Sequence, residues 1–249
     1  MSAKILAHRG ASAYRPENTL ESFLLAVEQK ADGFELDVHF SKDGVVVVAH
    51  DEELGRVSDG TGLINDHTLE ELKAFNFNKL FPDQPVCRMP TLAEVFSLAR
   101  NTDLIINIEL KTTRLFYPGL AEKLVKLVHG FDMQERVIYS SFNHYSLLEI
   151  KQRDPSAKTG LLYELGLVDP WVYAKYAKAD AIHPHYFIIA SLPETVKNCH
   201  ENGIAVNVWT VDDPKAISLM MSLGVDAVIT NKPDAAFECR TNLGEGRGA

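Results

Sequence analysis

The sequence has few cysteines and no long apolar segment. Its three cysteines, Cys87, Cys199 and Cys239, are widely spaced and form no Cys-x-x-Cys pair, a pattern typical of reduced thiols in an intracellular protein. No stretch approaches the roughly 18 apolar residues that a membrane-spanning helix needs. The first ten residues contain only the apolar run ILA before a His-Arg pair, which is too short for a signal peptide. We therefore expect a cytoplasmic protein without membrane insertion.

Positive charge is also scarce. Lys and Arg number 25 against 34 Asp and Glu, which gives a formal net charge of -9 and an isoelectric point near 5.5. A field of this sign repels polyanions, which argues against nucleic acid as the main partner, although a small anion could bind at a local basic site. We expect a small-molecule ligand, and formation of a homo-oligomer stays open.

What the sequence does contain is a regular alternation of short apolar strands with segments of helical character. Eight predicted strands are centred on Ile5, Glu35, Ile108, Ile138, Leu161, Ile182, Val206 and Val228. Eight such units predict an α/β fold of the (β/α)8 barrel class. We expect one domain over residues 1–241, with a small insertion at about 52–90 where Gly, Asp, Asn and Pro interrupt the pattern, and a disordered tail at 242–249.

Capping residues mark several helix starts. Asn18 with Glu21, and Thr91 with Glu94, show the spacing of a capping box. A further helix is expected within the insertion at 68–75. These starts place helices directly after the first strand and before the third, as a barrel requires.

The segment GFELDVHFSKDGVVVVAHD at 33–51 predicts a β-hairpin. Strand alternation places Glu35 and Asp37 on one face. A four-residue loop would set Glu35 opposite His50, and a two-residue turn would set Asp37 there, so both registers bring His50 to the carboxylate face. A three-residue loop with a bulge would break this parity. The same pattern also fits an amphipathic hairpin whose polar side lies in water, and His39 is expected at the surface.

Functional residues of a (β/α)8 barrel gather at the carboxyl ends of its strands. Three carboxylates, Glu35, Asp37 and Glu109, are predicted to meet there. Without a cation they would repel one another or take up protons. An all-oxygen ligand set favours a hard divalent cation, Mg²⁺ or Ca²⁺, over zinc.

Two histidines and two cationic residues reach the same rim. His8 and His50 titrate near neutrality and suit a general acid and base pair. Arg9 and Lys111 suit stabilisation of a phosphoryl group, and a simple ion pair with a neighbouring carboxylate is the less favoured alternative for each. Trp209, at the end of a later strand, fits either core packing or a substrate platform. Together these residues point to cleavage of a phosphodiester.

The motifs that hold these residues resemble those of the glycerophosphodiester phosphodiesterase family. They run in order along nearly the whole chain, and one position departs from the family pattern, since Asp212 stands where an Asn is common. The motifs are AHRG at 7–10, PENT at 16–19, ELD at 35–37, SKDG at 41–44, HD at 50–51, IELK at 108–111, VWTVDD at 208–213 and GVDAVITNKP at 224–233.

The resemblance implies a metal-dependent hydrolase on a TIM barrel. It would split glycerophosphodiesters such as glycerophosphocholine or glycerophosphoethanolamine into sn-glycerol 3-phosphate and an alcohol, with the insertion walling the glycerol side of the site. An alternative on the same barrel is a lysophospholipase D or a cyclising phosphodiesterase, and a non-catalytic phosphate-ester binding protein would have lost site residues. Carried over by motif, the acid and base are His8 and His50, the cation ligands are Glu35, Asp37 and Glu109, and the phosphate or substrate contacts are Arg9, Lys111 and Trp209.

Overall fold

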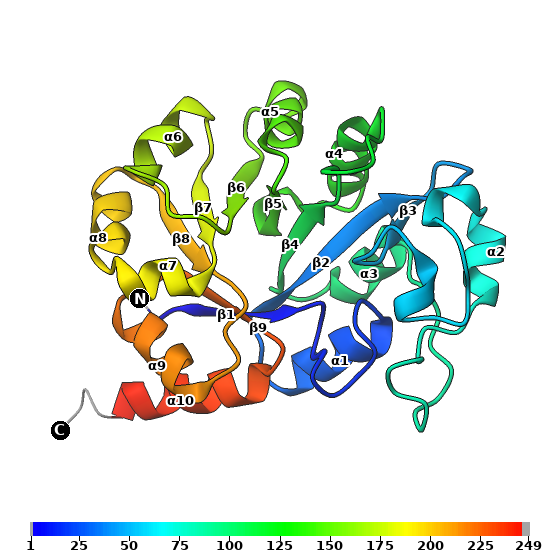
Figure 1. The fold of residues 1–249 in the computed structure, drawn as a ribbon, viewed down its shortest axis with the longest axis horizontal. Helices are drawn as coiled ribbons and strands as arrows, with labels where there is room; N and C mark the ends of the chain where they lie inside the picture. The colour runs from blue at the N-terminus through cyan, green and yellow to red at the C-terminus, as the bar shows by residue number, and fades with distance from the viewer. Residues whose placement is uncertain (1, 246–249) are drawn as a thin grey trace.

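In the computed structural model, which describes residues 2–245, eight parallel strands form a closed barrel inside a ring of helices (Figure 1). The strand order is β1-β9-β8-β7-β6-β5-β4-β2, and pairing of β1 with β2 closes the ring. The (β/α)8 prediction is therefore confirmed. The barrel strands are β1 (Lys4–His8), β2 (Gly33–Phe40), β4 (Ile105–Leu110), β5 (Val137–Ser141), β6 (Lys158–Tyr163), β7 (Ala181–Pro184), β8 (Ala205–Val208) and β9 (Ala227–Thr230).

The helices lie outside the barrel, and two of them, α7 and α10, were not expected from the sequence. The segment 242–245, within the predicted tail, belongs to α10, while 246–249 lie outside the described residues. The helices around the barrel are α1 (Leu20–Glu28), α3 (Leu92–Ala99), α4 (Leu120–Gly130), α5 (His144–Arg153), α6 (Pro170–Tyr176), α7 (Tyr186–Ser191), α8 (Glu194–Glu201), α9 (Pro214–Ser222) and α10 (Pro233–Glu245). Within residues 2–245, no helix has the length and apolar character needed to cross a membrane.

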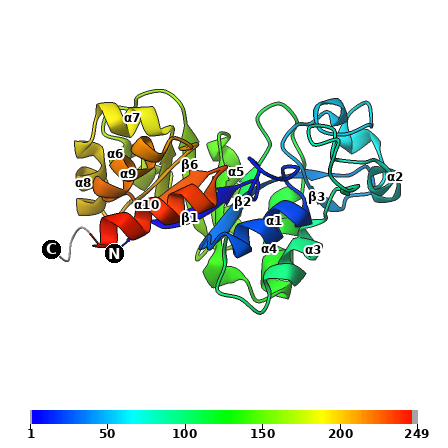
Figure 2. The same cartoon turned by 90° about the horizontal axis from the view of Figure 1, so that it is seen from below.

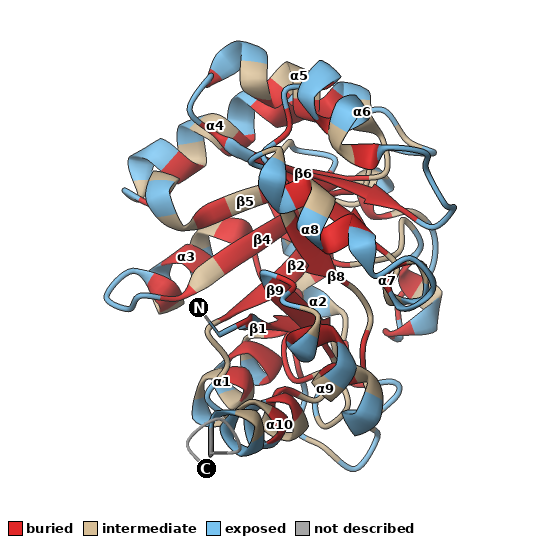
Figure 3. Ribbon diagram, turned by 90° about the vertical axis from the view of Figure 1, so that its left-hand side faces the viewer, coloured by how far each residue is buried: buried red, intermediate tan, exposed pale blue. Residues whose placement is uncertain are grey.

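The core fills the layer between the strands and the helices (Figure 3). On β2 the outward-facing Phe34, Leu36 and Val38 are fully buried, and Phe34 stacks on Phe23 of α1 with 4.5 Å between ring centroids. Burial of each such side chain stabilises the fold by about 1.5–3 kcal/mol. Because side chains alternate along a strand, burying this apolar face turns Glu35 and its polar neighbours toward the barrel interior.

The predicted N-cap of α1 is wrong by one residue. The cap is Thr19, whose hydroxyl accepts a hydrogen bond from the Ser22 backbone N–H, and the Ser22 side chain accepts one from Thr19 N–H. Asn18 instead adopts a left-handed conformation with φ of 56° and donates its side-chain amide to Asp37. The capping box of Thr91 on α3 is confirmed.

The predicted hairpin forms, but neither proposed register is correct. Phe40 of β2 pairs with Val46 of β3 (Val46–Val48), because the connecting loop spans the five residues 41–45. That loop is held by Ser41, whose side-chain oxygen accepts a hydrogen bond from Val45 N–H at 2.9 Å. The odd loop length breaks the expected parity. His50 therefore lies beyond the end of β3, and the path of the chain after the strand brings it to the site.

The insertion follows β3 and has a small core of its own. Leu54, Ile64, Leu72 and Met89 are almost fully buried in a hydrophobic cluster separate from the main one. The insertion lies beside the barrel at the hairpin end, as two views show (Figures 1 and 2). Its short helices are η1 (Leu54–Arg56), η2 (Ile64–Asp66) and α2 (Leu69–Ala74), the last capped by Thr68 within the expected range.

Candidate active site

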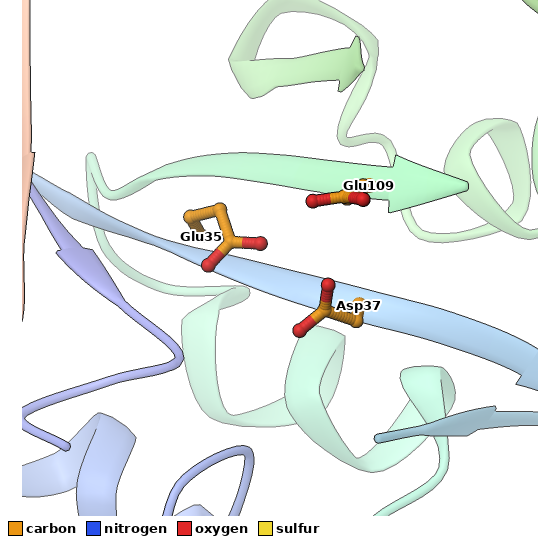
Figure 4. A group of neighbouring side chains, drawn as sticks. All are labelled: Glu35, Asp37 and Glu109. Carbon is orange, nitrogen blue, oxygen red and sulfur yellow. The ribbon is translucent and has the colours of Figure 1, made fainter. Parts of the chain in front are cut away.

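Three carboxylates from two neighbouring strands converge inside the barrel. Glu35 and Asp37 project from β2, and Glu109 projects from β4 toward them (Figure 4). The parallel register pairs Asp37 with Glu109, which places their side chains on the same face. One ligand oxygen from each of the three residues lies within 4.8 Å of the others. The structure thus brings together the whole carboxylate set expected from the sequence.

The charges of this cluster are balanced only in part by the protein. Burial raises the pKa of Glu35 well above its usual value, and the charges of Asp37 and Glu109 raise it further. The pKa of Glu109 is raised for the same reasons, burial first and Asp37 second. Asp37 is different: burial opposes its ionisation, but Arg9 and Lys111 lower its pKa well below the usual value.

These residues fit a divalent cation. Glu35 Oε1 and Asp37 Oδ1 are buried and have no hydrogen-bond partner among the described residues. Buried carboxylate oxygens without donors are costly, and a cation among them would remove both the missing contacts and the repulsion. A set of carboxylate oxygens is the donor set that Mg²⁺ and Ca²⁺ prefer.

His50 lies at the mouth of the barrel between an anion and a cation. Its Nδ1 is 2.7 Å from Asp51 Oδ1, and its Nε2 is 3.2 Å from Lys111 Nζ. The carboxylates of Asp37 and Glu109 outweigh burial and raise the pKa of Lys111, which keeps its ammonium protonated. An ammonium group can only donate, so Nε2 of His50 accepts and Nδ1–H donates to Asp51.

His8 reaches the same cluster from the end of β1. Its Nε2 is 3.9 Å from Glu35 Oε2, and its Nδ1 is 2.7 Å from Asn231 Oδ1. Burial, followed by the charge of Arg9, lowers the pKa of His8 to about 4, so the imidazole is neutral near pH 7. The two histidines predicted from the sequence therefore flank one carboxylate cluster.

Arg9 contacts the cluster and is held by a tight turn. Its Nε is 3.4 Å from Asp37 Oδ2, its guanidinium donates to Glu17 at 3.0 Å, and its backbone N–H donates to Glu35 Oε2. Arg9 has φ of 56° and Gly10 has φ of 80°. A Cβ at Gly10 would also lie 2.3 Å from the Ser22 side chain, so this turn needs glycine.

Comparison with known proteins identifies the family of the chain. Residues 8–235 match the Glycerophosphoryl diester phosphodiesterase family. The chain belongs to this family. A glycerophosphodiester phosphodiesterase of Caldanaerobacter subterraneus is 45% identical over 238 residues, which cover 94% of this chain and 96% of that protein.

Solved structures of the family agree with the fold. An Oleispira antarctica phosphodiesterase in complex with the product sn-glycerol-3-phosphate is 27% identical, with a TM-score of 0.84 and 96% of each chain covered. A Thermotoga maritima glycerophosphodiester phosphodiesterase is 31% identical, with a TM-score of 0.77, covering 96% of this chain and 98% of that one.

Several residues of this family member's site were missed or misplaced by sequence reasoning. Asn18 donates its side-chain amide to Asp37 Oδ2 at 2.9 Å, although the sequence suggested a helix cap. His39, expected at the surface, is fully buried and contacts the His50 backbone oxygen at 3.2 Å. Asn18 belongs to the PENT motif, which could have indicated it as a site residue. No local pattern indicates His39, because its environment comes from the hairpin and the loop after β4.

Arg56 of the insertion is a further residue that the sequence did not single out. Its guanidinium donates to Glu17 at 2.6 and 2.9 Å, and its Nε donates to Asp51. Glu17 also accepts from Arg9, so alternating charges connect Arg9 with the partner of His50. The insertion thereby helps to position both Arg9 and Asp51, the partner of His50.

A cleft of about 500 Å³ opens beside His50 and Lys111. Its walls include Arg56 of the insertion and Arg114 of the loop after β4, so the insertion does form one side of the site. Trp209 lies elsewhere on the rim, just after β8. Its indole N–H donates to a backbone oxygen at 2.7 Å, and its ring packs edge-on against two other rings, which supports a packing role and leaves a substrate contact untested.

Proposed function

We propose that this family member hydrolyses water-soluble glycerophosphodiesters, such as glycerophosphocholine and glycerophosphoethanolamine, to sn-glycerol 3-phosphate and an alcohol. The observation that carries the proposal is the buried cluster on β2 and β4. Three carboxylates have oxygens within 4.8 Å of one another, and His8 and His50 lie beside them. The Oleispira relative, which was solved with sn-glycerol-3-phosphate, supports the product assignment.

Glu35, Asp37 and Glu109 would hold a divalent cation, Mg²⁺ or Ca²⁺. When bound, the cation supplies positive charge next to the phosphate oxygens, which stabilises the extra negative charge of the transition state. Burial and then mutual repulsion raise the pKa of Glu35 and Glu109, and a bound ion would offset the repulsion. Its identity is a matter for the assay below.

The protein's own residues would bind the phosphate and move the protons. Arg9 and Lys111 lie within 4 Å of the carboxylate cluster and would hold phosphate oxygens. One of His8 and His50 would take the proton of the attacking group, water or the glycerol 2-hydroxyl, and the other would protonate the leaving alcohol. Attack by the 2-hydroxyl would pass through a cyclic phosphate, and incorporation of solvent oxygen in one step without a cyclic product would favour attack by water.

One observation favours a second candidate, a lysophospholipase D that acts on a glycerophosphodiester bearing an acyl chain. Large apolar side chains are exposed on connections that follow barrel strands, at the end of the barrel where the site lies. Such side chains could lie along an acyl chain. They include Phe116, Leu165, Val168 and Phe187. Release of choline from lysophosphatidylcholine, compared with release from glycerophosphocholine, separates the two candidates.

The test of the proposed function is release of glycerol 3-phosphate by the purified protein, first with chelator and then with Mg²⁺ or Ca²⁺ restored. We expect release that needs the cation and is lost in His50→Ala. The matched control is His200→Ala, which removes another histidine that pairs with an aspartate, Asp226, at 2.8 Å on the surface away from the strands' carboxyl ends. A folded wild-type protein that releases nothing with either ion would contradict the proposal.

We also propose that the protein works in the cytoplasm. Its three cysteines are free and buried, which suits a reducing compartment. We propose that the protein can form a homo-oligomer, which size-exclusion measurements would test. The net charge of -9 argues against nucleic acid as a partner.

A further inference from the structure

His8 is connected through hydrogen bonds to Asp212, a carboxylate that the proposed function does not use. Its Nδ1 lies 2.7 Å from Asn231 Oδ1, just after β9. The Asn231 amide nitrogen in turn donates to Asp212 Oδ2 at 2.6 Å. The other oxygen of Asp212 accepts from the Asn231 backbone N–H at 2.8 Å and from the Thr230 hydroxyl at 3.0 Å. Asp212 thus accepts three hydrogen bonds from two consecutive residues.

This arrangement leaves one orientation for the Asn231 amide. A carboxylate only accepts, so the side of the amide that faces Asp212 must be its NH2 group. The amide oxygen must then face His8 and Ser12, whose hydroxyl lies 2.6 Å from it. The orientation therefore follows from the chemistry of Asp212.

We propose that Asp212 and Asn231 are positioning residues that fix the tautomer of His8. Because the amide oxygen accepts, Nδ1 of the neutral imidazole must carry the proton, and Nε2 keeps a free lone pair toward the carboxylate cluster. Nε2 is then the atom that takes up a proton and later returns it, whichever acid or base step His8 performs. The inference deepens the proposed function and rests on it for the catalytic role of His8.

His50 reaches the same state by a direct route. Its Nδ1 faces Asp51, a carboxylate that can only accept, at 2.7 Å. His8 has a neutral amide in that place, which could donate as well as accept. A second residue is therefore needed to choose between the two orientations, and Asp212 supplies that choice.

The network predicts opposite outcomes for two variants. In Asp212→Asn, the new side chain must keep its oxygen toward the Asn231 backbone N–H, which cannot turn away, so its NH2 group faces the Asn231 amide. The Asn231 amide then flips, its NH2 group donates to His8 Nδ1, and the proton of the imidazole moves to Nε2. In the double variant Asp212→Asn with Asn231→Asp, Asp at 231 accepts from both sides, and His8 returns to the Nδ1–H form.

The experiment is ¹⁵N NMR of the histidine rings in the cation-free protein near neutral pH, with His8 assigned from the spectrum of His8→Gln. We expect Nδ1–H for His8 in the wild type, Nε2–H in Asp212→Asn, and Nδ1–H again in the double variant. The control is Asp213→Asn, the same change one residue away. Asp213 caps α9 by accepting from Ala216 N–H at 3.0 Å, and Asn caps helices equally well.

Kinetics provide a second readout. We expect kcat with glycerophosphocholine to fall about 100-fold in Asp212→Asn, with KM within about twofold, and to recover to within about tenfold in the double variant. An unchanged Nδ1–H form in Asp212→Asn, or an Nε2–H form in the double variant, would overturn the inference. If Asp212→Asn does not fold, the wild-type spectrum still decides, because an Nε2–H form of His8 there would overturn the inference. Because the NMR readout needs no turnover, failure of the proposed substrate would leave it intact and separately decided.

Discussion

Replacing Glu35 by Gln should make the cation-free protein more stable while removing its response to the cation. The three carboxylates have oxygens within 4.8 Å of one another. Two like charges at that separation repel by about 3.5 kcal/mol at an effective dielectric constant of about 20. Gln fills nearly the same volume and its oxygen can still accept from Arg9 N–H, as Glu35 does at 3.0 Å. The attraction of Arg9 to Glu35 offsets part of the repulsion, so we expect a net gain of about 1–3 kcal/mol.

The sign of the pH dependence follows from the raised pKa of Glu35 and Glu109. Their folded-state pKa values lie above the unfolded value of about 4.3, so the folded protein holds protons that the unfolded chain has lost. Without cation, the contribution of these two groups to stability should therefore be greatest below that value and fall as pH rises through their folded-state pKa values. In Glu35→Gln this fall should be smaller.

The assay is thermal unfolding in chelator and then with Mg²⁺ or Ca²⁺ added. In chelator at neutral pH, Glu35→Gln should unfold about 2–12 °C above the wild type, at about 2–4 °C per kcal/mol for a chain of this size. Added cation should raise the Tm of the wild type and leave that of the variant almost unchanged. The control, Glu149→Gln on the exposed side of α5, should shift stability by less than about 0.5 kcal/mol. A lower Tm for Glu35→Gln in chelator, or an undiminished cation response, would refute the electrostatic argument.

Two other substitutions test local parts of the structure. Asp51→Asn leaves an amide beside His50 Nδ1 in place of a carboxylate at 2.7 Å. We expect kcat to fall about 100-fold with little change in Tm. Activity equal to that of the wild type would show that Asp51 does not orient the ring. Gly33→Ala would place a Cβ 2.0 Å from the Ile105 backbone oxygen, and we expect a loss of at least about 3 kcal/mol in denaturant unfolding. Gly130→Ala, whose Cβ would meet nothing within 4 Å, is the control and should not destabilise the protein.

The sequence alone was enough to predict the barrel, because its signals are local. A strand shows itself by apolar and β-branched residues at short spacing, and the strand centred on Ile108 appears in the structure as Ile105–Leu110. Thr91 and its capping box also act over three residues. Alternation along β2 placed Glu35 and Asp37 on one face without knowledge of any distant contact.

The hairpin shows where a local pattern stops being sufficient. Turn residues at 41–44 predicted a reversal but not a loop of five residues, and that one extra residue changed the register. His50 still reaches Lys111, because the chain beyond β3 is positioned by the insertion and by the loop after β4, not by strand alternation. His50 was therefore placed beside the carboxylates for a reason that the structure does not support.

Only the closed barrel decides the contacts that orient the histidines. His8 and Asn231 are 223 positions apart in the chain, and they meet because β1 pairs with β9. Neither residue type nor spacing indicates that Asp212 holds the amide that faces His8. Residue chemistry thus determined which groups the site contains, while barrel closure determined which atom of His8 faces the carboxylate cluster, because a hydrogen bond depends on distances that sequence periodicity does not encode.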